Sequence, residues 1–238
     1  MVLRKYFPDF LTAMNLVCGL IALVFAFDGR PDLAFYMMLA AAVFDFCDGF
    51  AARALDAYSD LGKELDSLCD LVSFGVLPAV MLRLQMLAAG TAGWLCWIPL
   101  LLAVFSALRL AKFNVDDRQK ASFIGLPTPA CAMLCAAFCH YVHANPSGVL
   151  ASWASGPVLI PLVSLCLSFL LVCELPMFSM KFHADDSPAL KRRRLAFLVL
   201  AAFSVAACLV FGLTWSFAVM LVFVVYILLN SIFAMFRV

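Results

Sequence analysis

A series of long apolar segments constrains this chain more than any other feature of its sequence. A helix needs about 20 apolar residues to cross the hydrocarbon core of a bilayer. Segments near that length lie at residues 10–27, 32–53, 64–85, 92–113, 126–144, 153–178, 195–211 and 214–236. Only 13% of the residues are charged, whereas roughly a quarter is usual in soluble domains. We therefore predict an all-α, polytopic membrane helical bundle with eight transmembrane helices, formed by a single domain over residues 1–238.

Basic residues lie mostly at one set of helix ends. That set contains Arg4, Lys5, Arg53, Lys63, Arg109, Lys112, Arg118, Lys120, Lys181, Lys191, Arg192, Arg193, Arg194 and Arg237. The opposite ends have only Arg30, with Arg83 nearby. Because cytoplasmic loops are enriched in Lys and Arg, we expect both termini to face the cytoplasm from the inner (cytoplasmic) membrane. We expect the helices to contact membrane lipids, and we expect no nucleic-acid partner.

The N-terminal residues 4–10 mix basic and aromatic side chains, which is typical of a segment that lies at the membrane interface. The first apolar span has no small-residue cleavage site and contains two polar residues, Thr12 and Asn15. We therefore expect this span to be a retained helix rather than a signal peptide, preceded by an interfacial N-terminal segment.

Four of the aspartates between residues 45 and 70 form one regular pattern in this largely apolar chain. The pattern D-x-x-D-G-x-x-A-R-x8-G-x-x-x-D-x-x-x-D contains Asp45, Asp48, Gly49, Ala52, Arg53, Gly62, Asp66 and Asp70. A carboxylate at membrane depth costs about 2.5–3.5 kcal/mol on insertion scales, so such residues usually serve a function. The spacing of three or four residues within each pair puts both members on one helix face. Two adjacent antiparallel helices joined by a short loop would then bring all four carboxylates together.

This arrangement favours a divalent-metal site beside a diphosphate. Oxygen-only ligands suit Mg²⁺ or Mn²⁺, which also bind substrate phosphates. Gly49, Ala52 and Gly62 leave room for a ligand, and the Arg53 guanidinium could hold a diphosphate bidentately. Two metal ions could hold the attacking and leaving oxygens, while one aspartate takes the proton of an alcohol. The alternative from another class is a membrane cation carrier, although carriers usually place their acids nearer the membrane midplane.

The complete pattern resembles the signature of the CDP-alcohol phosphatidyltransferase family, with no departure at a defining position. The resemblance implies that a CDP-linked lipid and a small alcohol react to give a phosphodiester lipid and CMP. It implies that Asp45, Asp48, Asp66 and Asp70 hold two divalent ions, and that Asp70 is the catalytic base. The residues that it implies for binding the CDP-lipid are Thr12, Asn15, Gly49, Ala52, Arg53, Ser59 and Gly62. The family core has six transmembrane helices after an interfacial segment and is commonly dimeric, so we expect a homodimer with two additional C-terminal helices.

Outside the signature, the chain resembles the branch of this family that uses CDP-diacylglycerol and L-serine as substrates. The resemblance is carried by residues 8–15, 66–75, 108–114 and 122–130. Lys112 stands where this branch usually has arginine. We expect Arg109, Lys112 and Asn114 to bind serine, because a zwitterionic amino acid needs a cation for its carboxylate and acceptors for its ammonium group.

Three other acceptor alcohols stay open at this point: glycerol 3-phosphate, an inositol phosphate and choline. A phosphorylated acceptor would need further cations near the site, and Arg118, Lys120 and residues 191–194 offer them. Choline would need an aromatic cage, and the chain contains 23 phenylalanines, too many to single one out.

Overall fold

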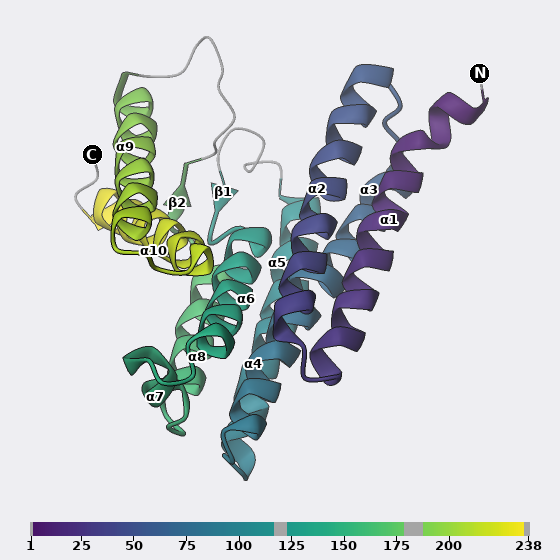
Figure 1. Ribbon diagram of the computed structural model, residues 1–238. Helices are drawn as coiled ribbons and strands as arrows, with labels where there is room; N and C mark the ends of the chain where they lie inside the picture. Colours follow the sequence, from purple (N-terminus) through teal and green to yellow (C-terminus); the bar gives the residue numbers. More distant parts are fainter. Residues whose placement is uncertain (1, 117–122, 179–187, 236–238) are drawn as a thin grey trace.

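The computed structural model of the protein describes residues 2–116, 123–178 and 188–235, and these are almost entirely helical (Figure 1). The α-helices in these ranges are α1 (Val2–Phe27), α2 (Pro31–Leu55), α3 (Asp60–Asp70), α4 (Leu77–Ala88), α5 (Leu101–Val115), α6 (Thr128–Ala144), α7 (Val149–Ala154), α8 (Leu159–Val172), α9 (Pro188–Val210) and α10 (Trp215–Met235). A π-helical turn, η1 (Leu71–Val76), joins α3 to α4, and a 3₁₀ helix, η2 (Trp94–Leu100), leads into α5. Two short strands, β1 (Phe123–Ile124) and β2 (Pro176–Met177), pair in antiparallel fashion. The predicted all-α bundle is confirmed.

Six helical stretches in the described part of the chain are long and apolar enough to cross a membrane. They are Tyr6–Phe27, Pro31–Leu55, Asp60–Ala88, Trp94–Val115, Leu190–Val210 and Trp215–Ala234. Each one coincides with a predicted span, and the ends differ by a few residues. The third stretch runs unbroken through α3, η1 and α4, because the wider π-helical turn keeps the backbone helical between them.

The other two predicted spans form shorter helices. Helix α6 has 17 residues and α8 has 14, and at about 1.5 Å per residue both are shorter than the bilayer core of roughly 30 Å. The prediction of one helix over residues 153–178 is wrong at both ends. Pro157 separates α7 from α8, and Pro176 lies in β2, because proline lacks an N–H group and disfavours helical backbone before it.

The predicted interfacial N-terminal segment is the beginning of α1, which runs from Val2 without interruption. Pro8 lies inside this helix, and Figure 1 shows the first turns of α1 leaning away from the rest of its axis. A proline removes one backbone hydrogen bond and bends a helix at that point. The location of these turns at a membrane interface stays a prediction.

The helix ends that carry basic residues lie on the same side of the bundle. Figure 1 shows the start of α1, the α2–α3 loop and the start of α9 at its upper end, and the α1–α2 turn and α7 at its lower end. Across the upper side, the Lys63 ammonium donates a hydrogen bond of 2.8 Å to the backbone oxygen of Asn114, and Lys112 forms a 3.5 Å ion pair with Glu174. The predicted one-sided distribution is confirmed for these residues. Arg118, Lys120, Lys181 and Arg237 lie outside the described residues.

Helix α1 packs against α2, α3 and η1, so it holds together the elements that carry the four aspartates. Its Gly19 faces Ser73 of η1 so closely that a Cβ atom at position 19 would collide with the Ser73 hydroxyl group. The same hydroxyl donates a 3.2 Å hydrogen bond to the Asn15 backbone oxygen. Close backbone approach at a small residue is how helices associate in membranes, and here it fixes the segment that follows Asp70.

Candidate active site

The loop between α2 and α3 consists of residues 56–59. Asp56 ends α2 in the left-handed conformation, with a φ of 49°, and its N–H contacts the last carbonyl groups of that helix. Ser59 begins α3 as its N-cap, where its hydroxyl oxygen accepts a 2.9 Å hydrogen bond from the Gly62 N–H. Aspartate tolerates left-handed backbone and serine is a favoured N-cap. These local preferences reverse the chain between the two pairs of acids.

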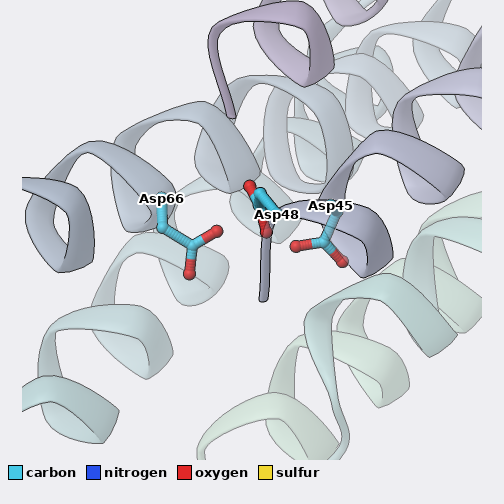
Figure 2. A group of neighbouring side chains, drawn as sticks. All are labelled: Asp45, Asp48 and Asp66. Atoms are coloured by element: carbon cyan, nitrogen blue, oxygen red, sulfur yellow. The ribbon is translucent and has the colours of Figure 1, made fainter. Parts of the chain in front are cut away.

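Three of the four predicted metal ligands converge. One carboxylate oxygen from each of Asp45, Asp48 and Asp66 lies within 4.8 Å of the other two. Figure 2 shows the side chains of Asp66 and Asp45 extending toward each other from opposite sides, with Asp48 between them. Asp70 is buried and lies beside Asp45, close enough for the two carboxyl groups to share a hydrogen bond.

Helix α1 supplies hydrogen-bond donors to the acids on both neighbouring helices. The Thr12 hydroxyl donates a 2.6 Å hydrogen bond to Asp48 Oδ2, and the Asn15 amide donates one of 3.1 Å to Asp70 Oδ1. Helices α2 and α3 present their acids to one another, as predicted, and α1 packs against both helices. The acids therefore face one another across a gap that α1 spans.

The donor set at this gap fits a divalent cation. All the converging ligand atoms are carboxylate oxygens, which hard ions such as Mg²⁺ and Mn²⁺ prefer. Asp66 Oδ1 and Asn15 Oδ1 are buried and have no hydrogen-bond partner in the described structure. Buried acceptors are nearly always satisfied, and several adjacent carboxylates repel one another without positive charge between them. Bound cations would resolve both problems.

A pocket of about 540 Å³ opens beside the acids. Its walls are Pro8, Asp9, Thr12, Asp48, Gly49, Ala52, Ala57, Tyr58, Ser59, Asp60, Gly62, Lys63 and Asp66. Five of the predicted CDP-lipid residues are in this lining, namely Thr12, Gly49, Ala52, Ser59 and Gly62. A Cβ at Gly62 would lie 2.8 Å from Asp9 Oδ1 and 3.0 Å from the Ser59 hydroxyl oxygen. The small residues of the signature therefore line the pocket, and a side chain at position 62 would push against Asp9. Their role in binding a ligand stays a prediction.

The other two predicted CDP-lipid residues lie outside the pocket lining. Arg53 is exposed, and its Nη1 is 3.8 Å from the place that a Cβ on Gly49 would occupy. Its guanidinium thus lies at the edge of the space that Gly49 leaves. Asn15 is fully buried and bonded to Asp70. The role of both residues in binding the CDP-lipid stays a prediction.

Sequence reasoning missed four polar pocket residues: Asp9, Tyr58, Asp60 and Lys63. Asp60 and Lys63 lie in the first turn of α3, on either side of Gly62. They occupy unspecified positions of the signature, and their closeness to Gly62 is the one sequence feature that could have identified them. Asp9 comes from the N-terminal end of α1, and no spacing rule connects it with residues 50 positions further along the chain.

The three predicted serine-binding residues of α5 have different surroundings. Arg109 is 6% exposed and donates a 2.9 Å hydrogen bond from Nη1 to the Thr128 hydroxyl, and its charge interacts with the Asp70 carboxylate. Lys112 extends to Glu174 at the surface. The Asn114 amide donates a 2.9 Å hydrogen bond to Ser67 of α3. Of the three, Arg109 is therefore the residue whose charge interacts with the aspartate cluster.

The sequence matches the model of one protein family, described as CDP-alcohol phosphatidyltransferase, over residues 5–165. The chain belongs to the CDP-alcohol phosphatidyltransferase family. The matched region contains all four aspartates, the pocket and Arg109. Together with the six long apolar helices, membership of this family establishes an integral membrane protein.

The three curated relatives described next are all named CDP-diacylglycerol–serine O-phosphatidyltransferase. One from Mycobacterium tuberculosis is 42% identical over 133 residues, which cover 53% of this chain and 46% of that protein. One from Bacillus subtilis is 32% identical over 184 residues, 77% of this chain and 96% of that protein. One from Methanocaldococcus jannaschii is 34% identical over 141 residues, 57% of this chain and 61% of that protein. The matched region thus spans about half the length of the mycobacterial relative.

Proposed function

We propose that the protein transfers the phosphatidyl group of CDP-diacylglycerol to the hydroxyl group of L-serine, which yields phosphatidylserine and CMP. The observation that carries this proposal is the convergence of Asp45, Asp48 and Asp66 beside a pocket of about 540 Å³ walled by the small residues of the signature. The names of the relatives from three organisms support serine as the acceptor.

The four aspartates would hold two divalent ions, Mg²⁺ or Mn²⁺, whose charge would offset that of the diphosphate and of the developing transition state. Thr12 and Asn15 keep two of these carboxylates in place through the hydrogen bonds from α1. A metal-ligating carboxylate that also accepts such a hydrogen bond is already oriented before the reaction begins. The pocket side of Asp48 and Asp66 is where the diphosphate would lie.

Asp70 is the proposed general base. It would take the proton of the serine hydroxyl as the serine oxygen bonds to the phosphorus of the phosphatidyl group and CMP leaves with the electrons of the broken bond. The Asn15 amide orients the Asp70 carboxylate from one side. The charge of Arg109 interacts with that of Asp70, and we assign the serine carboxylate to Arg109, because a guanidinium matches a carboxylate with two parallel hydrogen bonds.

Two further parts of the proposal concern the surroundings of the enzyme. The positive-inside rule favours an active site that faces the cytoplasm from the inner membrane, with residues 1–238 acting as one membrane domain. The family resemblance favours a homodimer. In this orientation the CDP group would lie at the cytoplasmic surface while the acyl chains stay in the adjacent leaflet.

The test is CMP release by the purified protein with CDP-diacylglycerol and, separately, serine, glycerol 3-phosphate, an inositol phosphate or choline. We expect release only with serine, and only in the presence of Mg²⁺ or Mn²⁺. Asp70→Asn should abolish release, while the matched control Asp32→Asn in the same membrane protein should not, because Asp32 forms a partly exposed ion pair with Arg30 at the opposite end of α2. Preference for another acceptor would overturn the serine assignment, and activity without CDP-lipid dependence would favour a carrier.

A further inference from the structure

Helices α9 and α10 lie outside the region that matches the family model, which ends at residue 165. They nevertheless pack onto the family core, because α10 lies against α6 as well as against α9 (Figure 1). Helix α6 begins at Thr128, the residue that accepts the hydrogen bond of Arg109. The C-terminal helices are therefore placed to act on the part of the site assigned to the acceptor.

Two side chains of α10 hold the backbone of Phe178 at the end of β2. The Tyr226 hydroxyl donates a 3.0 Å hydrogen bond to the Phe178 carbonyl oxygen. Asn230 Oδ1 accepts a 3.0 Å hydrogen bond from the Phe178 N–H, and its amide donates one of 2.8 Å to the Tyr226 carbonyl oxygen. All three hydrogen bonds are buried. Both backbone polar groups of Phe178 thus depend on α10.

The strand that precedes Phe178 connects this contact to the Gly125–Thr128 turn. β2 pairs with β1, and the turn after β1 donates backbone hydrogen bonds from Gly125 to Leu175 (2.9 Å) and from Leu126 to Leu170 (2.8 Å). Gly125 has a φ of +79°, and a Cβ there would lie 2.6 Å from the Leu171 carbonyl oxygen. Only glycine fits this position. The turn is therefore hydrogen-bonded to the segment that leads to Phe178, the residue that α10 holds in place.

Tyr226 also lies near Arg109 itself. The side chain is 6% exposed, and its hydroxyl group and the Arg109 guanidinium interact electrostatically. Because the Tyr226 proton goes to Phe178, the hydroxyl presents its oxygen lone pairs to other neighbours, which suits a cationic one. The Arg109 guanidinium is thus hydrogen-bonded to Thr128 of α6, and its charge interacts with Tyr226 of α10 and with the carboxylate of Asp70.

We propose that Tyr226 is a positioning residue for the acceptor alcohol: anchored to Phe178, it sets the Arg109 guanidinium where the serine carboxylate binds. This inference rests on the proposed function, and it deepens that function by giving the C-terminal helices a role in acceptor binding. A small misplacement of a charged group that orients a substrate costs binding and rate. The lining of the pocket assigned to the donor lipid includes Asp48 and Asp66 but neither Arg109 nor Tyr226, so the affinity for the donor should not depend on Tyr226.

The experiment compares Tyr226→Phe with the unchanged full-length protein in lipid nanodiscs. Phenylalanine keeps the ring contacts of Tyr226 with Phe178 and Phe197, whose centroids lie 5.3 and 5.7 Å away, so the fold should persist. The matched control is Tyr141→Phe, which makes the same change at the other end of the α6–α10 pair, where Tyr141 packs on Phe217. A second variant, Asn230→Ala, removes the other hydrogen bond to Phe178.

We expect Tyr226→Phe and Asn230→Ala to raise the KM for serine roughly threefold to tenfold, the range for one lost hydrogen bond. The KM for CDP-diacylglycerol should stay close to that of Tyr141→Phe. An unchanged KM for serine, or equal rises in both KM values, would overturn the inference. If the unchanged protein releases CMP only with another alcohol, the proposed function itself fails, and this inference fails with it.

Discussion

Replacing Thr12 with valine removes a hydroxyl group from the metal-binding region without changing the shape of the side chain. The hydroxyl of Thr12 lies 2.6 Å from Asp48 Oδ2 and 3.1 Å from the Pro8 carbonyl oxygen. It has a single proton, and the shorter, charge-assisted bond to the carboxylate is the stronger of the two. Thr12 is 3% exposed and Asp48 is 5% exposed, so water has little access to replace the lost donor.

The size of the effect follows from the kind of hydrogen bond that is lost. A hydrogen bond to a charged group contributes about 1.5–3 kcal/mol, and every 1.4 kcal/mol corresponds to roughly a factor of ten in a binding constant. Removal of a residue that orients a metal ligand typically costs 10–100-fold in metal affinity or activity. We therefore expect Thr12→Val to raise the Mg²⁺ or Mn²⁺ concentration for half-maximal activity at least ~tenfold.

The assay is CMP release at saturating serine and CDP-diacylglycerol, titrated with each metal ion. Thr12→Ser is the matched control, because it keeps the hydroxyl and loses only the methyl group, and its titration should lie much closer to that of the unchanged protein. A Thr12→Val protein with an unaltered metal titration would show that α1 does not support the metal ligands, and the reasoning for this site would be wrong.

Two further substitutions separate the parts of the site. Gly62→Ala should raise the KM for CDP-diacylglycerol roughly threefold or more, because the new Cβ pushes against Asp9. The thermal midpoint should stay level or rise, since alanine favours helix over glycine by about 1 kcal/mol. An unchanged KM for CDP-diacylglycerol would mean that the pocket does not hold the donor. Arg109→Lys keeps the charge but loses the planar fork, so we expect more than a ~tenfold loss in kcat/KM for serine. Lys112→Ala should cost less than ~threefold, because an exposed ion pair contributes about 0–1 kcal/mol; equal losses would contradict the assignment of Arg109 to the serine carboxylate.

Local sequence patterns predicted most of the helices and the three-aspartate convergence. Apolar runs of bilayer length mark the six long helices because the bilayer imposes the same length on each of them. The i, i+3 and i, i+4 spacing of the acids predicts a shared face because helix geometry repeats over those intervals. The break at Pro157 follows from an equally local rule, because proline disfavours helical backbone. The prediction of one helix across Pro157 neglected that rule.

The contacts that complete the site connect residues far apart in the chain. Thr12 reaches Asp48 across 36 positions and Asn15 reaches Asp70 across 55, so no spacing rule could pair them or place α1 against both acid-bearing helices. Tyr226 reaches Phe178 across 48 positions. Hydropathy and helical period depend on neighbouring residues alone, and they establish which segments cross the membrane and which face of each is polar. Which polar faces meet depends on the packing of helices against one another, and that packing is what turns four isolated aspartates into one site with α1 on one side and Arg109 on another.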